Sequence, residues 1–216
     1  SGVIARYSQL PAAELTFYRL GVGALCVGFW LLLTGKAKLL LQKPDRQTLQ
    51  NGVLLASFML GFLQAIQTIS LANAIMMVYL APPCTAIVAH YYFAERLSLG
   101  SSLLILLALL GFAMLQQFQF DISANPAQFD GYCWALLSLV AYSAFLLCNR
   151  KPATGTSVEQ RTFYQLLFGA VCVLPFLSTS TVPQGQDWLW VVLAGVFPGF
   201  LAIGCALAAL AHLPNR

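Results

Sequence analysis

The stretch Thr16–Leu31 reads TFYRLGVGALCVGFWL, and the pattern returns at Thr162–Leu177 as TFYQLLFGAVCVLPFL. Nine of the sixteen positions are identical without a gap. Apolar segments match at a few positions through composition alone, but a shared TFY followed by G-A-x-C-V is more specific. We therefore interpret the chain as two homologous units, with Gly131 opening the second.

Composition places both units in a membrane. The 216 residues are 59% hydrophobic and only 8% charged, whereas soluble domains carry roughly 25% charged residues. So little charge cannot cover a water-facing surface, so lipid must face much of the chain. The net charge of +4 is spread over short gaps rather than gathered in a basic patch, which argues against a nucleic-acid partner. The six cysteines lie in apolar stretches without a C-x-x-C pair, as expected of packing residues rather than metal ligands.

About seven segments are long and apolar enough to cross a bilayer as helices, which needs about 20 residues each. The sequence thus predicts an all-α membrane protein. The spans are Leu15–Thr34, Gly52–Leu71, Ala72–Phe93, Leu97–Gln117, Gly131–Asn149, Phe163–Ser178 and Trp188–Leu210. We expect a tight turn around Ala72–Ala74, between the second and third spans.

Basic residues predict how the spans are oriented. If the spans alternate in direction, nine of the eleven basic residues lie on one side, and Arg6 and Arg19 are assigned to the other. Cytoplasmic loops carry an excess of Lys and Arg, so we expect the basic side to face the cytoplasm. The nine are Lys36, Lys38, Lys43, Arg46, Arg96, Arg150, Lys151, Arg161 and Arg216.

The two units differ in completeness. A full span, Gly131–Asn149, precedes the TFY stretch of the second unit, but only Ser1–Tyr7 stands there in the first. In the first unit two further spans follow the position that corresponds to His212, whereas the second unit has no span after His212 in this sequence. We expect a fragment of about ten helices, five in each unit, lacking the first helix and the last two. An odd number of spans inverts one unit against the other, as in the inverted repeats of secondary transporters.

Several short motifs keep a characteristic order along the chain. They are Pro11, Phe17–Leu20, Tyr79–Pro82, Glu95–Ser98 and Gly111. In this order and spacing the chain resembles the EamA-type drug/metabolite transporters, with a proline before an arginine and a mid-helix proline before a terminal glutamate. A second glycine of that pattern is absent, because Leu104 stands in its place. This departure bears on local packing rather than on the fold.

The resemblance implies a multi-pass carrier of the inner (plasma) membrane that moves an amino acid, a nucleotide-like compound or a drug, often outward. It implies a first repeat at residues 1–117, a linker at 118–130 and a second repeat at 131–216. The implied partners are a small-molecule substrate and the lipid bilayer, without a cofactor, and a homodimer is left open. Alternating access by rocking of one repeat against the other would follow.

Polar residues in apolar spans are costly, so they face protein or a water-filled path. In the second span, Gln64 and Thr68 share a helical face with Gly61, and Gln67 lies beside it. We take these polar residues as substrate-pathway candidates. Hydrogen bonding between helices is the competing interpretation.

A stripe in the third span comprises Met76, Tyr79, Pro83 and His90. Pro82 and Pro83 remove backbone donors and predict a kink, whose freed carbonyls can line a cavity. The competing interpretations are a static bend and, for His90, a packing residue rather than a proton gate.

In the fifth span, Trp134, Ser138 and Tyr142 share a face with Phe145 and Asn149. Their aromatic and polar groups suit a planar or zwitterionic solute, and we expect Tyr142 and Gln64 to line one water-accessible cavity. The alternative is a packing stripe in which Trp134 anchors the helix at the membrane interface.

Near the end of the chain, Gly195 and Gly199 flank Pro198 as a small-xxx-small ridge. Such a ridge favours close helix packing.

Chemical groups that the predicted spans lack argue against several classes of function. All seven carboxylates lie at or beyond the predicted span ends, and no Gly-rich phosphate loop is present, so an ATPase is not expected. A secondary carrier is favoured over a seven-helix receptor, which predicts no internal repeat. An intramembrane enzyme, the other alternative, requires a nucleophile–base pair or a metal set within the spans, and none is found.

Overall fold

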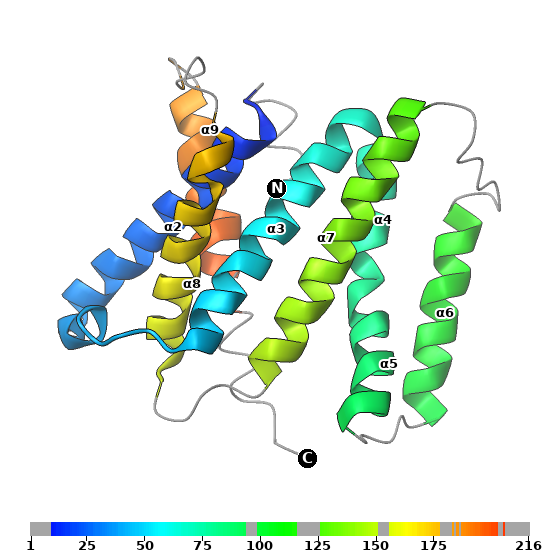
Figure 1. The fold of residues 1–216 in the computed structure, drawn as a ribbon, viewed down its shortest axis with the longest axis horizontal. Helices are drawn as coiled ribbons and strands as arrows, with labels where there is room; N and C mark the ends of the chain where they lie inside the picture. The colour runs from blue at the N-terminus through cyan, green and yellow to red at the C-terminus, as the bar shows by residue number, and fades with distance from the viewer. Residues whose placement is uncertain are drawn as a thin grey trace.

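The computed structural model describes residues 10–93, 99–115, 126–150, 156–177, 183, 185, 187–202 and 205. Within these residues every element is helical (Figure 1), which confirms the all-α class. Outside them lie Glu95 and Arg96, residues 118–125 of the predicted linker, and the chain end with His212 and Arg216.

The helices follow the seven predicted spans in order. They are α2 (Ala12–Leu33), η1 (Ala37–Leu40), α3 (Arg46–Thr68), α4 (Leu71–Tyr79), α5 (Ala81–Phe93), α6 (Leu99–Leu115), α7 (Pro126–Arg150), α8 (Val158–Val173), η2 (Leu174–Phe176), α9 (Asp187–Ala194) and η3 (Gly195–Leu201). The third span is two segments, α4 and α5, and the seventh changes into a π-helix at η3.

Four helical stretches are long and apolar enough to cross a membrane, judged by length and composition alone. The stretch Ala12–Leu33 is α2, and the others are Arg46–Thr68, Leu71–Tyr91 and Gln128–Asn149. Shorter apolar helices run through Ser102–Gly111 and Asp187–Leu201. The described part of the chain is therefore a multi-pass helical membrane protein.

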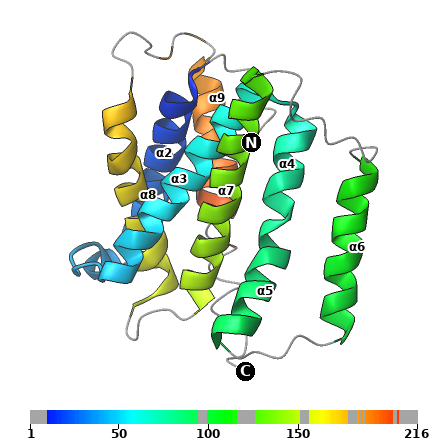
Figure 2. The same cartoon turned by 45° about the vertical axis from the view of Figure 1, so that its right-hand side comes forward.

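The helices form one bundle with α3 and α7 at its centre. On one side of this pair, α8 packs on both α2 and α3, and α2 packs on η3. On the other side, α4 and α5 pack on α7, and α6 stands at the outer edge beyond them (Figures 1 and 2). The core contains Leu20, Leu55, Met59 and Leu166, all nearly fully buried.

Apolar side chains also cover the outside of the bundle. Leu103 of α6 is 66% exposed, and Leu25 of α2 and Val140 of α7 are exposed in the same way. An apolar exterior over a packed core is the arrangement that a lipid environment permits, as the composition predicted.

Several helix boundaries differ from the prediction because capping side chains set them. Ser70 caps α4 by accepting a 3.1 Å hydrogen bond from the Asn73 amide, so the turn falls before Ala72–Ala74, which is already helical. Ser157 caps α8 in the same way, ahead of the expected start at Phe163. Pro126 begins α7 ahead of Gly131, as its fixed φ angle favours at a first helical position.

The connections that carry the basic residues lie at one end of the bundle. The segment between α2 and α3, with Lys36, Lys38 and Lys43, is at the lower end in Figure 1, as are the end of α7 and the start of α8. The expected segregation of basic connections at one end is thus present among these helices.

Candidate functional site

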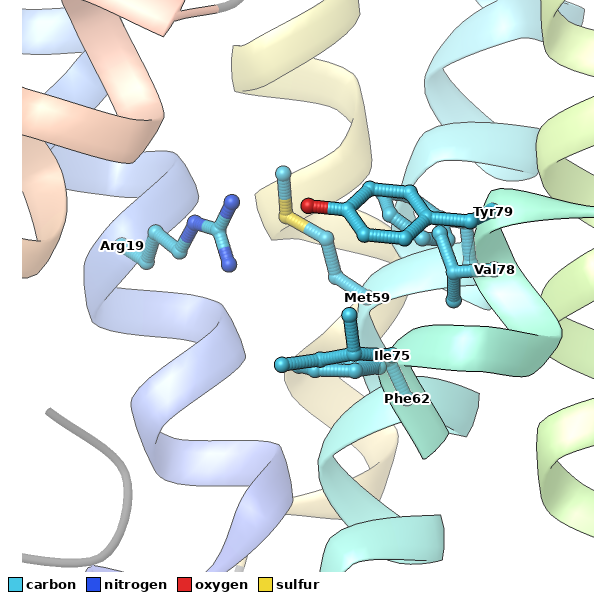
Figure 3. Close-up of a pocket in the computed structure, with 7 residues that line it drawn as sticks. Arg19, Met59, Phe62, Ile75, Val78 and Tyr79 are labelled. Atoms are coloured by element: carbon cyan, nitrogen blue, oxygen red, sulfur yellow. The ribbon is translucent and has the colours of Figure 1, made fainter. Parts of the chain in front are cut away.

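A cavity of about 230 Å³ lies where α2, α3 and α4 meet. Arg19 of α2 forms one side, and Tyr79 of α4 lies opposite it (Figure 3). The remaining lining residues come from α3 and α4 and are all apolar: Phe58, Met59, Phe62, Ile75 and Val78.

Among the lining residues that the structure describes, Arg19 is the charged one. It lies about two turns inside α2, at 1.5 Å per residue, and is only 8% exposed. The assignment of Arg19 to a side of the membrane together with Arg6 is therefore wrong: its side chain is in the interior of the bundle. Figure 3 shows its guanidinium pointing from α2 toward Met59 and the hydroxyl end of Tyr79.

The π-helix η3 supports Arg19 from behind. The Nη2 group of Arg19 donates a hydrogen bond of 3.4 Å to the carbonyl of Pro198. The backbones approach closely here, since a Cβ added to Gly199 would lie 2.8 Å from the Arg19 carbonyl oxygen, and one added to Gly195 would overlap Val22. This confirms the close packing predicted for the Gly195–Gly199 ridge. π-Helical turns occur frequently at functional sites.

A helix break borders the opposite wall. Leu80 separates α4 from α5 two residues before Pro82, so the helix is interrupted beside the prolines at which a kink was predicted. Because proline has no N–H, the carbonyls of Val78 and Tyr79 lack the donors that a continuous α-helix would supply. Both residues line the cavity.

The stripe predicted on the fifth span packs against α3 at Gly61 and Phe58. A Cβ added to Gly61 would lie 3.0 Å from the Trp134 carbonyl oxygen, and Ser138 donates a 3.0 Å hydrogen bond to the Phe58 carbonyl. Tyr142 stacks on Phe58, with ring centroids 4.5 Å apart and an interplanar angle of 22°. Ser138 and Tyr142 therefore support a cavity residue from behind.

Of the ten predicted pathway residues, Tyr79 is the one that lines this cavity. Gln64 is half-buried on α3, and Gln67 and Thr68 are exposed toward its end. Met76, Pro83 and His90 are half-buried on α4 and α5, as is Trp134 on α7. The ring of His90 meets the edge of Tyr91 at 5.3 Å.

Other buried polar residues were not among the predicted pathway residues. Glu14, assigned to a position beyond the span, lies in the first turn of α2 and is buried. Asn149 accepts hydrogen bonds from both Arg161 and Gln165 in the interior. Arg19 carried a usable signal, because a charge within an apolar span marks a functional site by default, whereas the apolar lining residues carried none.

Comparison with known proteins identifies the family. The EamA-like transporter family matches residues 1–116 and 130–215. The chain belongs to this family. A solved crystal structure shares the fold, with a TM-score of 0.73 at 21% identity, covering 96% of this chain and 73% of the other.

Two curated relatives resemble this EamA-family chain. The uncharacterised transporter YxxF of Bacillus subtilis (strain 168) is 26% identical over 200 residues, covering 90% of this chain and 64% of the relative. The pseudopaline exporter CntI of Pseudomonas aeruginosa (strain UCBPP-PA14) is 24% identical over 195 residues, covering 88% and 65%. The chain thus spans just under two thirds of the length of these relatives.

Proposed function

We propose that this protein is a secondary transporter that moves a small metabolite across the membrane, outward, by alternating access between two inverted units. The observation that carries the proposal is the cavity between α2, α3 and α4, lined by a buried arginine and bordered by a helix break. Membership of the EamA-like transporter family supports it, and so does the likeness to a protein named as an exporter.

The packing of the two TFY helices supports the inverted units. Gly23 and Gly169 occupy the same position in the two stretches. A Cβ on Gly23 would meet Gly199 of η3 at 3.2 Å, and one on Gly169 would meet the Gly52 carbonyl of α3 at 3.0 Å. Each TFY helix thus packs on the helix that follows the other one. This reciprocal exchange is what a pseudo-two-fold relation between repeats produces.

The test is flux through the full-length protein in proteoliposomes. Amino acids, nucleotide-like metabolites and cationic drugs are loaded in turn, with protein-free vesicles and a working carrier as controls. We expect saturable flux of at least one class, without ATP. Absence of saturable flux for every class, while the control carrier works, contradicts the proposal.

A further inference from the structure

Arg19 brings a positive charge into the cavity, and no acidic side chain among the described residues pairs with it. A guanidinium stays protonated in proteins, and its burial without a compensating charge is costly. Within the part of the chain that the structure describes, Arg19 makes one hydrogen bond, 3.4 Å long, to the neutral Pro198 carbonyl. Its Nε group is buried without a hydrogen-bond partner there, and the ion pair among these residues is Lys36–Glu159. The cavity therefore offers an unmatched cation to an incoming group.

The rest of the lining suits an apolar body. Phe58, Phe62 and Ile75 provide rings and methyl groups without charge. The stacking of Tyr142 behind Phe58 holds that ring in a fixed orientation, so Phe58 presents a defined surface. The Tyr79 hydroxyl points toward the Arg19 side in Figure 3, where it is available to a second polar atom of a ligand.

The size of the cavity suits a small ligand. A cavity of 150 Å³ lined by apolar side chains holds benzene. By the same proportion, a cavity of about 230 Å³ holds roughly nine non-hydrogen atoms. A ring with a short acidic side chain has this size.

We propose that the cavity binds a small carboxylate anion with an apolar, planar body, the carboxylate on Arg19 and the body between Phe58, Phe62 and Ile75. Arginine pairs with a carboxylate through parallel N–H···O bonds, and Nε is one of the donors that such a pair uses. The proposal rests on the proposed function, since it names the substrate class of the same cavity.

The first experiment compares ligands that share one body and differ in charge. The full-length protein in nanodiscs is titrated by calorimetry with phenylacetate, neutral 2-phenylethanol and cationic 2-phenylethylamine. We expect phenylacetate to bind at least about tenfold more tightly than the other two, as one charge-assisted pair allows. Equal affinity for phenylacetate and 2-phenylethanol, or no phenylacetate binding, overturns the proposal.

The second experiment separates the effect of the Arg19 charge from the effect of the cavity volume. Arg19→Gln removes the cation, and Ile75→Trp fills the cavity while leaving Arg19 in place. Arg46→Gln is the matched control, because Arg46 is exposed at the start of α3, away from the cavity. We expect Arg19→Gln and Ile75→Trp to weaken phenylacetate binding at least about tenfold, with Arg46→Gln unchanged. If Arg19→Gln does not fold, Ile75→Trp and the ligand series decide; wild-type affinity in either folded cavity variant overturns the proposal.

Failure of this inference differs from failure of the proposed function. Saturable flux of some other solute, without phenylacetate binding, leaves transport standing and removes the carboxylate assignment. Binding of phenylacetate that depends on Arg19, without flux of phenylacetate or any other solute, supports the site and contradicts transport.

Discussion

Arg161 on α8 donates a 2.8 Å hydrogen bond to Oδ1 of Asn149 on α7. Gln165 donates to the same oxygen at 3.0 Å, and the Asn149 amide donates back to the Phe145 carbonyl at 2.8 Å. Asn149, Arg161 and Gln165 are all buried. One amide oxygen therefore joins α7 to α8 at the bundle end that carries the basic connections.

Replacement of Asn149 by Leu should destabilise the protein strongly. The change leaves the Arg161 guanidinium and the Gln165 amide buried without this acceptor, and a buried donor left unsatisfied costs about 1–3 kcal/mol, with more for a charged donor such as Arg161. Denaturant unfolding in detergent measures the loss. Asn149→Asp is the control, because it keeps the acceptor and should lose much less. Equal stability of Asn149→Leu and wild type contradicts the structural role of this bond.

Close backbone packing at Gly199 predicts a second sensitive position. In Gly199→Ala, the new Cβ would lie 2.8 Å from the Arg19 carbonyl oxygen, a backbone atom that cannot move without displacing α2. We expect a loss of about 1–3 kcal/mol, as for other overpacked positions, and weaker ligand binding because Arg19 moves with α2. Thermal unfolding and phenylacetate titration measure the two effects.

The control for this variant is Gly21→Ala on α2. A Cβ at Gly21 meets no atom within 4 Å, so the change should be neutral or stabilising, because alanine favours a helix over glycine by up to about 1 kcal/mol. If Gly199→Ala and Gly21→Ala behave alike, the helices are not in contact as the structure has them.

Much of the fold was predictable because the bilayer sets the length and the apolar character that a membrane-spanning helix must have. The break at Pro82 was predictable for a similar reason, since a missing N–H is a covalent property of the residue. The helix boundaries at Ser70 and Ser157 were less predictable, because a serine caps a helix only where its side chain reaches the right backbone amide. Which helices pack together is a tertiary property; it depends on contacts such as that of Gly23 with Gly199.

The site was predictable only in part. Tyr79 was found because it belongs to the stripe of Met76, Pro83 and His90 beside the predicted kink. Phe58 and Met59 look like any core residues, and three-dimensional packing alone places them beside a cavity. Arg19 was assigned with Arg6 to the less basic side of the membrane, although it stands within the predicted span Leu15–Thr34, where two helical turns suffice to bury it.

The Lys36–Glu159 ion pair predicts a pH dependence of stability. The two groups lie 2.7 Å apart between the α2–α3 connection and the first turn of α8. The hydrogen bond from Lys36 is the main cause that lowers the pKa of the Glu159 carboxyl below its usual value. A lowered carboxyl pKa in the folded state gives stability above the unfolded pKa, and this stability is lost as the pH falls through the folded value.

Glu159→Gln should therefore be less stable than wild type at pH 7, and this difference should be smaller at about pH 3, below the ordinary glutamate range. The pair is at the surface, so the difference at pH 7 should be at most about 1 kcal/mol. Thermal unfolding at a series of pH values measures it. Lys43→Gln, which removes a neighbouring exposed lysine, should show no such trend. If the stability difference between Glu159→Gln and wild type is the same at both pH values, the Lys36–Glu159 pair is not its cause.

The break between α4 and α5 predicts opposite effects on stability and binding. Replacing Pro82 and Pro83 together by Ala supplies N–H donors for the carbonyls of Val78 and Tyr79, so the two helices can join into one. Each interior proline disfavours a helix by about 3 kcal/mol relative to alanine, so we expect a higher melting temperature. The two cavity residues should move as the helix straightens, and phenylacetate affinity should fall several-fold. Stabilising substitutions commonly cost function where a site depends on a local irregularity.

Thermal unfolding and calorimetric titration of this double variant check both effects in one preparation. Pro44→Ala is the control, because Pro44 lies in the connection before α3 and should leave the affinity for phenylacetate unchanged. If the double variant binds phenylacetate as wild type does, the break does not shape the cavity. If its melting temperature also stays at the wild-type value, the prolines do not hold the break open, and the sequence around Leu80 must do so by other contacts.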